Sequence, residues 1–387
     1  MSRKQKLGQY FTTNIELKEK IFEFILNNPL NILEPSIGQG DLVEFILNKN
    51  SDVIFDMYEI DNTIKLLNKI EKVKVIYTDF IKENINKKYK TIIGNPPYIK
   101  TKKGNIYIDF IEKCFNLLDT NGELIFIIPS DFFKLTSSSK LLNIMIAHGT
   151  FTHIFHPHNE KMFENASIDI IIFRYYKNNL IPKKVLYNDK LLHIINNNGF
   201  LVFNEEMNNN NISFKDYFDI YVGLVSGKEE IYKNQELGNI EVLNGEDKID
   251  KYIYIENFPS INQKINNYLL ENKEILIQRK IRKFNENNWF EWGAPRNITN
   301  INNNIGKDCI YIYNLTRKKN IAFLDKVNYF GGGLIMLKPK NNYNYLNLNN
   351  IISYLNSDIF KNNFIFSGRF KIGHRQISNS YIPNEYL

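Results

Sequence analysis

The sequence predicts an α/β protein of two domains, the first built on a doubly wound and mostly parallel sheet. The chain has 387 residues, and at roughly 150 residues per domain this length suits two domains with cores of their own. Over residues 1–180, apolar segments of strand length alternate with segments whose apolar residues recur at helical spacing. This alternation is typical of parallel strands connected by helices, with a ligand site at the carboxyl edge of the sheet.

The elements of the first domain follow from this pattern in chain order. A helix is predicted from residue 17 to residue 26, because Leu17, Ile21 and Phe24 recur at helical spacing. The next elements are expected at residues 31–34 (strand), 41–47 (helix), 52–61 (strand), 62–70 (helix), 74–80 (strand), 91–98 (strand and loop) and 123–133 (strand and loop). Residues 152–158 and 167–177 are strands with no helix-length segment between them, so we expect an antiparallel pair at the sheet edge.

The pattern of alternating strands and helices ends at about residue 180, where loop-like segments become frequent. Asparagine runs at 196–198 and 208–211 are typical of loops, although an AT-rich genome would also enrich asparagine throughout. We predict a first domain over residues 1–185, a linker over 186–210 and a second, mixed α/β domain over 211–387. Within the second domain we expect a helix at 261–272 and glycine turns at 331–333.

Composition narrows the class of protein. The 49 basic and 42 acidic residues give a net charge of +7, which permits a polyanionic partner without requiring one. No apolar run approaches the ~20 residues of a membrane span, and the basic N-terminus continues into polar residues, unlike a secretory signal. Two cysteines, Cys114 and Cys309, are too few for a disulfide framework. We therefore expect a soluble, cytoplasmic protein.

The strongest local signal is Asn95-Pro96-Pro97-Tyr98, which follows an apolar strand. At the end of that strand, the Asn95 amide oxygen and the Pro96 carbonyl, held by rigid prolines, offer two acceptors. Two acceptors suit an exocyclic NH₂ group, which has two hydrogens to donate, and Tyr98 offers a flat face for a planar base. A rigid Asn-Pro turn without a catalytic role is the alternative interpretation.

A second signal is the glycine-containing loop at residues 33–41, between a strand and a helix. Its glycines allow close approach of a ligand to the backbone, but it is neither the GxGxxG dinucleotide fingerprint nor a Walker loop. Glu59 and Asp79 end the next two strands, where carboxylates can bind ribose hydroxyls and an adenine amino group, with Phe80 beside the ring. Each carboxylate alone could be a helix N-cap; their order and spacing favour a ligand site.

These motifs, in this order, resemble the gamma-class N6-adenine DNA methyltransferases of type II restriction–modification systems over roughly residues 7–177. The residues that carry the resemblance are Gln9, Tyr10, Phe11 and Thr12 (methionine-binding motif), Glu34, Pro35, Ser36, Gly38 and Gly40 (methyl-donor loop), Glu59 and Ile60 (ribose), Asp79 and Phe80 (adenine), and Asn95, Pro96, Pro97 and Tyr98 (the catalytic NPPY motif, of which Asn95 and Pro97 also border the cofactor).

The resemblance implies S-adenosylmethionine as cofactor, bound in a Rossmann-like seven-stranded sheet with an antiparallel edge pair. It also implies that residues 1–185 are catalytic, that residues 211–387 recognise the DNA target, and that N6 of a flipped-out adenine is methylated. Family members supply a second aromatic that meets the flipped base, which we expect at Tyr175, with Phe173 on the same face. We expect neither a cysteine nucleophile nor a metal, since His148, His153, His156 and His158 fit no standard zinc pattern.

Arginine is concentrated in the last third of the chain, at Arg279, Arg282, Arg296, Arg317, Arg369 and Arg375. Arginine reads guanine edges and binds phosphate bidentately, so this bias suits a DNA-facing domain in which Trp289 and Trp292 lie among the basic residues. Any single basic run can equally be ordinary solvated surface. We expect double-stranded DNA as partner, a monomer on DNA, no membrane contact and a separate cognate restriction endonuclease.

Several alternatives remain open at this point. Enzymes with the same motif methylate N4 of cytosine, bases in RNA, or the glutamine N5 of proteins. A non-catalytic DNA-binding protein on the same scaffold is a further alternative, which the intact Asn95–Tyr98 motif disfavours.

Overall fold

The computed structural model describes residues 8–70, 74–101, 104–164, 166–205 and 212–387. Its internal contacts divide the chain into two compact units. The first comprises residues 1–207 with 362–368, and the second comprises residues 208–361 with 369–387. Each unit has its own hydrophobic core, as the length of the chain predicts.

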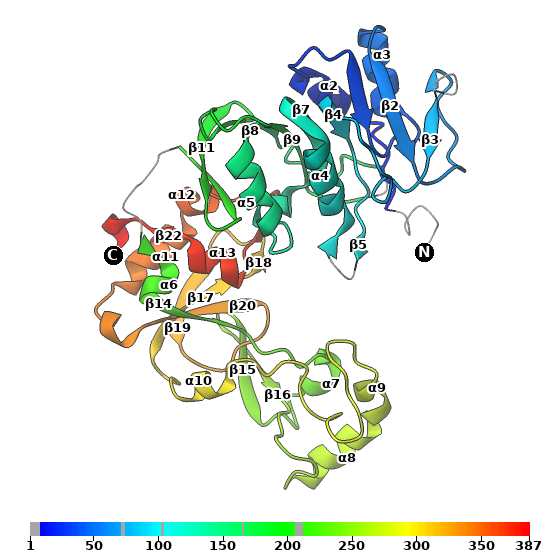
Figure 1. Ribbon diagram of the computed structural model, residues 1–387. Coiled ribbons are helices and arrows are strands. Elements are labelled where there is room, and N and C mark those ends of the chain that lie inside the picture. Colours follow the sequence, from blue (N-terminus) through cyan, green and yellow to red (C-terminus); the bar gives the residue numbers. More distant parts are fainter. Residues whose placement is uncertain (1–7, 71–73, 102–103, 165, 206–211) are drawn as a thin grey trace. The chain divides into compact units, whose positions relative to one another are not determined.

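A single sheet of ten strands forms the centre of the first unit (Figure 1). In spatial order the strands are β12 (Leu201–Asn204), β11 (Lys190–Asn196), β10 (Lys184–Tyr187), β8 (Thr150–Phe155), β9 (Ile170–Tyr176), β7 (Leu118–Pro129), β4 (Tyr89–Gly94), β1 (Asn31–Glu34), β2 (Ile54–Glu59) and β3 (Val75–Tyr77). Strands β7, β4, β1, β2 and β3 are parallel, whereas β9 is antiparallel to both of its neighbours. The predicted antiparallel pair, β8 and β9, is confirmed.

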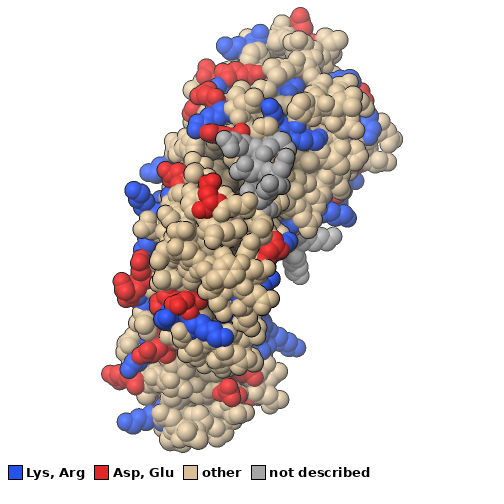
Figure 2. All heavy atoms as spheres, turned by 90° about the vertical axis from the view of Figure 1, so that its left-hand side faces the viewer, with Lys and Arg blue, Asp and Glu red and all other residues tan. Residues whose placement is uncertain are grey.

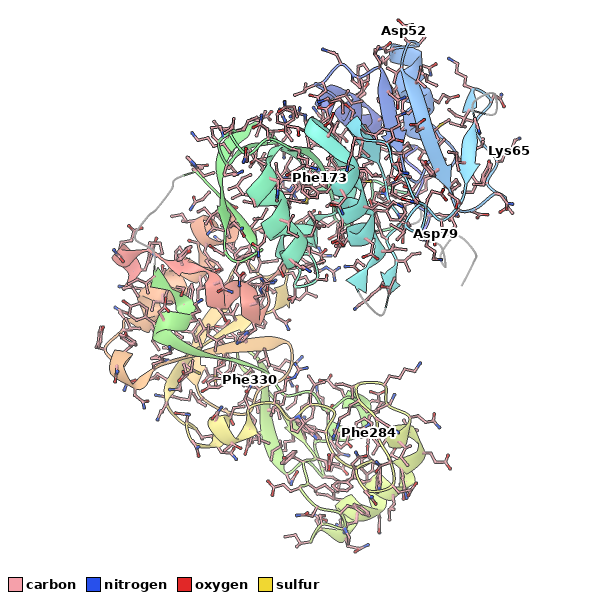
Figure 3. The ribbon with its side chains drawn as sticks, viewed as in Figure 1. Asp52, Lys65, Asp79, Phe173, Phe284 and Phe330 are labelled. Carbon is pink, nitrogen blue, oxygen red and sulfur yellow. The ribbon has the colours of Figure 1, made fainter. Side chains whose placement is uncertain are left out.

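Helices cover both faces of this sheet. They are α2 (Ile15–Phe24), α3 (Asp41–Lys49), α4 (Ile106–Leu117) and α5 (Ser139–His148). Along β7, Ile125 and Ile127 pack in the cluster that contains α2 and α3, and Phe126 and Ile128 pack in the cluster that contains α4 and α5. Phe173 of β9 belongs to the second of these clusters (Figure 3). Alternate residues of a central strand therefore face opposite helical layers. Both faces of the sheet are buried, which explains why the sequences of its central strands are continuously apolar. In the described ranges, no helix is long and apolar enough to cross a membrane.

The sheet continues beyond the predicted end of the first domain. Seven of its strands, from β8 to β3 in the spatial order, form the predicted seven-stranded sheet, and β10, β11 and β12 extend it on the β8 side. Residues 186–205 were expected in a linker, but they include strands that bury Leu192, Ile194 and Val202. The asparagine run at 208–211 lies outside the described residues.

The predicted helix over residues 62–70 is wrong, because the segment forms turns. The Asp61 carboxylate accepts bonds from the Thr63 backbone N–H and hydroxyl, at 3.1 and 2.6 Å. Further along, the backbone N–H of Leu67 donates to Gln39 O at 3.0 Å. Tertiary contact with the loop at 36–40 therefore overrides the helical spacing of the apolar residues.

A buried ion pair joins β7 to β9. The Arg174 guanidinium contacts the Glu123 carboxylate at 2.8 Å, and Glu123 has a fully buried side chain. The same carboxylate accepts from the Thr91 hydroxyl and from the backbone N–H groups of Leu26 and Asn27, at 2.9, 3.1 and 3.1 Å. These bonds fix the chain that leaves α2 against the sheet.

The second unit is mixed α/β. Its antiparallel sheet has the order β14 (Phe218–Val222), β20 (Leu334–Pro339), β17 (Asp308–Tyr313) and β19 (Ala322–Lys326), and β15 (Ile240–Gly245) forms a hairpin with β16 (Lys248–Tyr252). Its longer helices are α8 (Gln263–Glu271) and α11 (Leu348–Asn356), and the first of these confirms the helix predicted at 261–272. Trp289 and Trp292 lie in the core of this unit, each 2% exposed, so they are not available to stack on bases.

Candidate active site

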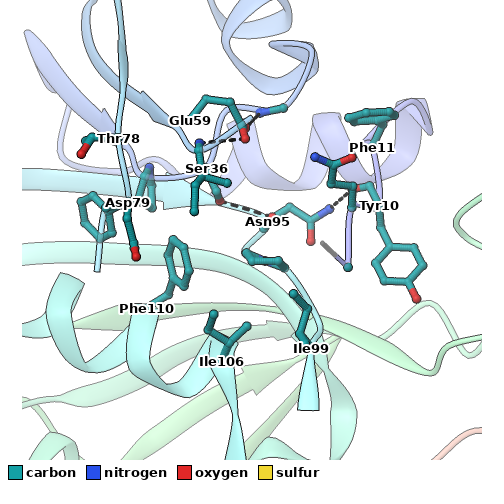
Figure 4. A pocket seen from close by; sticks show the side chains of 17 residues that line it. Tyr10, Phe11, Ser36, Glu59, Thr78, Asp79, Asn95, Ile99, Ile106 and Phe110 are labelled. Carbon is teal, nitrogen blue, oxygen red and sulfur yellow. Dashed lines mark hydrogen bonds between the residues drawn. The ribbon is translucent and has the colours of Figure 1, made fainter. Parts of the chain in front are cut away.

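A pocket of about 170 Å³ lies in the first unit and is shown from close by in Figure 4. It brings together most of the predicted cofactor residues, namely Gln9, Tyr10, Phe11, Pro35, Ser36, Gly38, Glu59, Ile60, Asp79, Phe80, Asn95 and Pro97. Of the remaining predictions, Thr12 bonds to Asn95, Gly40 begins α3, and Glu34 is buried at the end of β1. Residues that sequence reasoning missed also line the pocket, among them Ile106 and Phe110 of α4.

Glu59 connects the glycine loop to the end of β2. Its Oε2 accepts from Gly38 N at 2.9 Å, and its Oε1 accepts from Ile60 N and Asp61 N, each at 2.9 Å. Burial raises the pKa of the Glu59 carboxyl, and these backbone N–H groups oppose that rise. Gly38 has φ +59°, a conformation that favours glycine. The loop is thus held around a carboxylate that borders the pocket.

Another part of the pocket wall is formed by the residues that follow β3, the strand paired with β2. The Asp79 carboxylate accepts from Ile81 N at 3.1 Å, and the Phe80 ring is stacked on Phe110 with centroids 5.6 Å apart. Tyr58 meets Phe80 edge-on at 5.3 Å. Glu59 and Asp79 are the acidic groups among the described lining residues, which include no lysine or arginine. Two carboxylate acceptors, aromatic side chains and no cationic group in the described lining suit a positively charged ligand with a planar ring and hydroxyls better than they suit a polyphosphate.

The side chain of Asn95 is held in one orientation by bonds at both of its polar atoms. Its Nδ2 donates to Tyr10 O at 2.8 Å and to the Thr12 hydroxyl at 3.1 Å. Its Oδ1 accepts from the Tyr98 hydroxyl at 2.7 Å. Because both amide hydrogens are used by the N-terminal segment, the oxygen faces Tyr98 as an acceptor.

Tyr98 lies in an aromatic cluster beside Asn95. Its ring stacks on Tyr10 with centroids 5.3 Å apart and meets Phe163 and Tyr107 at 6.1 Å each. Burial raises the pKa of the Tyr98 phenol well above its usual value. Phe163 also meets Tyr10 at 5.6 Å, and it comes from the segment between β8 and β9. Sequence reasoning missed Phe163; the available signal was the apolar pair Met162-Phe163 within an otherwise polar segment.

Tyr175 does not reach this cluster. It is fully buried, and its hydroxyl donates to Met145 O of α5 at 2.7 Å. Phe173 is equally buried on the same face of β9. Both side chains pack in the core between the sheet and α5, so the structure places them apart from the pocket.

Glu34 occupies a buried position at the end of β1. Its Oε1 accepts from Ser36 N at 3.3 Å, whereas its Oε2 has no hydrogen-bond partner in the structure. Burial raises the pKa of Glu34 well above its usual value. A Cβ added to Gly94 would lie 2.9 Å from the Glu34 carboxyl, so a larger residue at this position of β4 would force that carboxyl to shift.

The predicted DNA-contacting arginines have different surroundings in the second unit. Arg279 is buried and donates to the carbonyls of Leu276, Ser226, Trp289 and Glu291. Its guanidinium carbon lies 3.8 Å from the ring centroid of Phe284, which is labelled in Figure 3. Arg282 pairs with Glu291 at 2.5 Å. Arg375 is half-buried, and Arg296, Arg317 and Arg369 are exposed. Arg279 therefore stabilises the fold of this unit and is not available to DNA.

The charged surface does not by itself mark a binding face. On the face drawn in Figure 2, basic and acidic side chains of the described residues are interspersed. Among the described residues, no group of three or more His, Cys, Asp or Glu side chains is placed to hold a metal ion. His156 instead bonds to Asp169 at 2.8 Å and to the Tyr187 hydroxyl at 2.7 Å.

Comparison with known proteins agrees with the resemblance to methyltransferases. Residues 12–163 match the family described as Eco57I restriction-modification methylase. This match confirms, over those residues, the resemblance to the DNA methyltransferases of restriction–modification systems.

Individual relatives extend the comparison. Type II methyltransferase M.HincII of Haemophilus influenzae is 33% identical over 199 residues, which cover 46% of this chain and 38% of the relative. Ribosomal RNA small subunit methyltransferase A of Mesomycoplasma hyopneumoniae (strain 232) is 40% identical over 105 residues, or 26% of this chain and 40% of the relative. The chain thus spans about two fifths of the length of these curated relatives.

A solved structure matches nearly the whole chain. The Type IIL restriction-modification enzyme MmeI, in complex with DNA, has a TM-score of 0.61 at 9% identity, covering 97% of this chain and 64% of MmeI. At this identity the likeness shows the fold alone. It confirms the predicted fold class, an α/β methyltransferase sheet with an additional mixed α/β unit.

Proposed function

We propose that this protein is a site-specific DNA methyltransferase that transfers a methyl group from S-adenosylmethionine to N6 of an adenine flipped out of the duplex. The observation that carries the proposal is the Asn95 amide, whose oxygen is presented as an acceptor between the acidic pocket and the aromatic cluster. The restriction–modification family match over residues 12–163 supports DNA as the substrate.

The lining of the pocket suits S-adenosylmethionine in its chemistry. Gln9, Tyr10 and Phe11 would contact the methionine end, Glu59 would accept from the ribose hydroxyls, and the walls at Asp79 and Phe80 would hold the adenine ring. A Cβ on Gly38 would lie 3.2 Å from the Phe11 ring, so a larger residue here would crowd Phe11 at the edge of the pocket. When bound, the cofactor supplies a methyl group activated by a sulfonium.

The residues around Asn95 would act on the target base. Adenine N6 is a poor nucleophile because its lone pair is delocalised into the ring. Hydrogen bonds from N6 to Asn95 Oδ1 and to the Pro96 carbonyl would favour a pyramidal nitrogen and stabilise the positive charge that develops on it. Flipping the base costs a few kcal/mol. Stacking on Tyr98 and Phe163 would partly offset this cost once the two rings, which are in contact in the structure and of which Phe163 is 5% exposed, separate to admit the base.

The two stacking aromatics should contribute directly to target binding. We expect Tyr98→Ala and Phe163→Ala each to weaken binding of DNA carrying an unpaired target base by roughly 5–150-fold, since a base–aromatic stack is worth about 1–3 kcal/mol. Fluorescence of 2-aminopurine at the target position measures this effect. Tyr175→Phe, which removes only a hydroxyl bonded in the core, is the control and should bind as the wild type does. Equal weakening by Tyr175→Phe would contradict the assignment of Phe163.

Cofactor affinity should depend on the ionisation of Glu59. Its carboxylate form accepts hydroxyl hydrogens, so affinity for S-adenosylhomocysteine is expected to fall as the pH is lowered through the pKa of Glu59. Because burial raises that pKa, the fall should begin at a higher pH than for an ordinary glutamate. Glu59→Gln should bind about tenfold more weakly at neutral pH and show a flatter profile. Calorimetric titration at several pH values tests this, and an unchanged profile in the variant would contradict it.

Double-stranded DNA is the partner that we propose for the second unit, with Arg296, Arg317 and Arg369 as exposed contacts and Arg282 and Arg375 as partly buried ones. We further propose that the enzyme acts as a monomer, with a separate cognate restriction endonuclease. The substrate class is tested by transfer of tritiated methyl groups to duplex DNA, structured RNA and a glutamine-containing protein in parallel. Transfer to DNA alone supports the proposal, and transfer to RNA alone would replace it with RNA methylation, as the name of the ribosomal RNA methyltransferase relative suggests.

A further inference from the structure

Lys113 lies behind the wall of the pocket, on the same helix that forms that wall. Ile106, Phe110 and Lys113 follow one another on α4 at spacings of four and three residues, so they share a helical face. Ile106 and Phe110 line the pocket. Lys113 is half-buried, and its ammonium reaches the turn that follows β3 rather than the pocket itself.

The ammonium of Lys113 donates to three backbone carbonyls of this turn. They are Phe80 O, Ile81 O, at 3.2 Å from Nζ, and Glu83 O. A lysine ammonium has three hydrogens to donate, so the turn offers one acceptor for each. Nζ also lies 4.7 Å from the centroid of the Phe80 ring, within range of a cation–π interaction.

The same turn carries the pocket residues Asp79 and Phe80. Its inner bonds run from Ile81 N to the Asp79 carboxylate at 3.1 Å and from Lys82 N and Glu83 N to Asp79 O at 2.9 and 3.1 Å. The carbonyls of Phe80, Ile81 and Glu83 converge on Lys113, and Phe80 O also accepts from Glu83 N at 3.3 Å. Without the ammonium they would lose their common donor, and the turn would keep the Phe80–Phe110 stack as its contact with α4 but lose the polar one.

We propose that Lys113 is a positioning residue, which acts through Asp79 and Phe80 to set the end of the pocket that would hold the adenine ring. This inference rests on the proposed function, since it takes that pocket to be the cofactor site. Lys113 does not line the pocket, and its role is to hold the two residues that do.

The test compares two half-buried lysines whose ammonium groups each bind backbone carbonyls at α4 or beside it: Lys113 belongs to α4, and Lys177 directly follows β9. Lys177 donates to Phe115 O and Leu118 O at 3.0 and 2.9 Å, and its Nζ lies 4.6 Å from the Phe115 ring centroid. It therefore binds the carboxyl end of α4 as Lys113 binds the turn, but it does not reach the residues that line the pocket. Lys177→Met is the matched control for Lys113→Met.

Binding of S-adenosylhomocysteine to the full chain is measured by calorimetry, and thermal unfolding is measured in parallel. We expect Lys113→Met to raise the Kd by about tenfold or more, and Lys177→Met to leave it within about twofold while lowering the melting temperature comparably. In steady state, Lys113→Met should raise KM for the methyl donor and retain kcat at saturation. A general loss of folding would instead lower kcat.

The outcomes separate this inference from the proposed function. If the wild-type chain binds S-adenosylhomocysteine and Lys113→Met binds it equally well, the positioning role is wrong and the proposed function stands. If the wild-type chain does not bind it, the proposed cofactor site is wrong, and this inference falls with it. Should Lys113→Met fail to fold, Lys113→Arg decides. Its planar fork keeps the charge but does not match three converging carbonyls, so weaker binding supports the inference and unchanged binding overturns it.

Discussion

Replacing Asn95 with alanine is expected to lower the rate of methyl transfer by about 10²–10³-fold or more, the loss typical when one preorganised polar contact to the reacting atoms is removed. The side chain is fixed by bonds to Tyr10 O and the Thr12 hydroxyl, so its oxygen is already in position before a target base arrives. Single-turnover transfer at saturating cofactor and DNA measures the chemical step directly.

Cofactor binding should survive this substitution. Asn95 contributes one side chain to a pocket with many other lining residues, including Glu59 and Asp79, so the affinity for S-adenosylhomocysteine should change by less than the transfer rate. Asn143→Ala is a suitable control, because Asn143 bonds to Asn196 and Asn198 at the surface of the same unit. Transfer by Asn95→Ala within about threefold of the wild type would rule out the catalytic role of this residue.

The largest expected effect on stability comes from Arg174. Arg174→Met would leave the Glu123 carboxylate, which is fully buried, without its cationic partner. Removing one member of a buried ion pair typically costs about 3–5 kcal/mol. We expect the unfolding free energy of the first unit to fall by that amount in urea titrations.

Two further variants identify the cause of this loss. Lys190→Met removes an ion pair to Glu205 whose side chains are 70% and 71% exposed, and it should cost about 0–1 kcal/mol. Adding Glu123→Gln to Arg174→Met removes the uncompensated charge and should recover part of the stability. If Arg174→Met costs no more than Lys190→Met, the pair contributes nothing beyond an exposed contact.

Much of the site could be predicted because its residues lie where strands end. Glu59 ends β2, Asp79 closely follows β3 and Asn95 directly follows β4. The carboxyl ends of parallel strands meet at one edge of a sheet. The local sequence therefore predicts that these three residues lie at the same edge of the sheet, once the strands are assumed to be parallel neighbours.

The errors arose where distant contacts decide the structure. Tyr175 was expected beside the base because the alternation of a strand shows which residues share a face but not which helical layer that face meets. Phe163 reaches Tyr98 only because β8 and β9 pair and bring their connecting segment to the site. Similarly, Arg279 lies in a basic segment of the kind that contacts DNA, and only the fold shows that its guanidinium donates to four backbone carbonyls.

The central claim is tested most directly by identifying the methylated product. The purified chain is incubated with unmethylated duplex DNA and S-adenosylmethionine, the DNA is digested to nucleosides, and these are analysed by mass spectrometry, with Asn95→Ala as the control. The account predicts N6-methyladenine with the wild type and its loss with the variant. N4-methylcytosine would contradict the assignment of the base, and no methylated nucleoside from several varied DNAs would contradict the claim that this is a DNA methyltransferase.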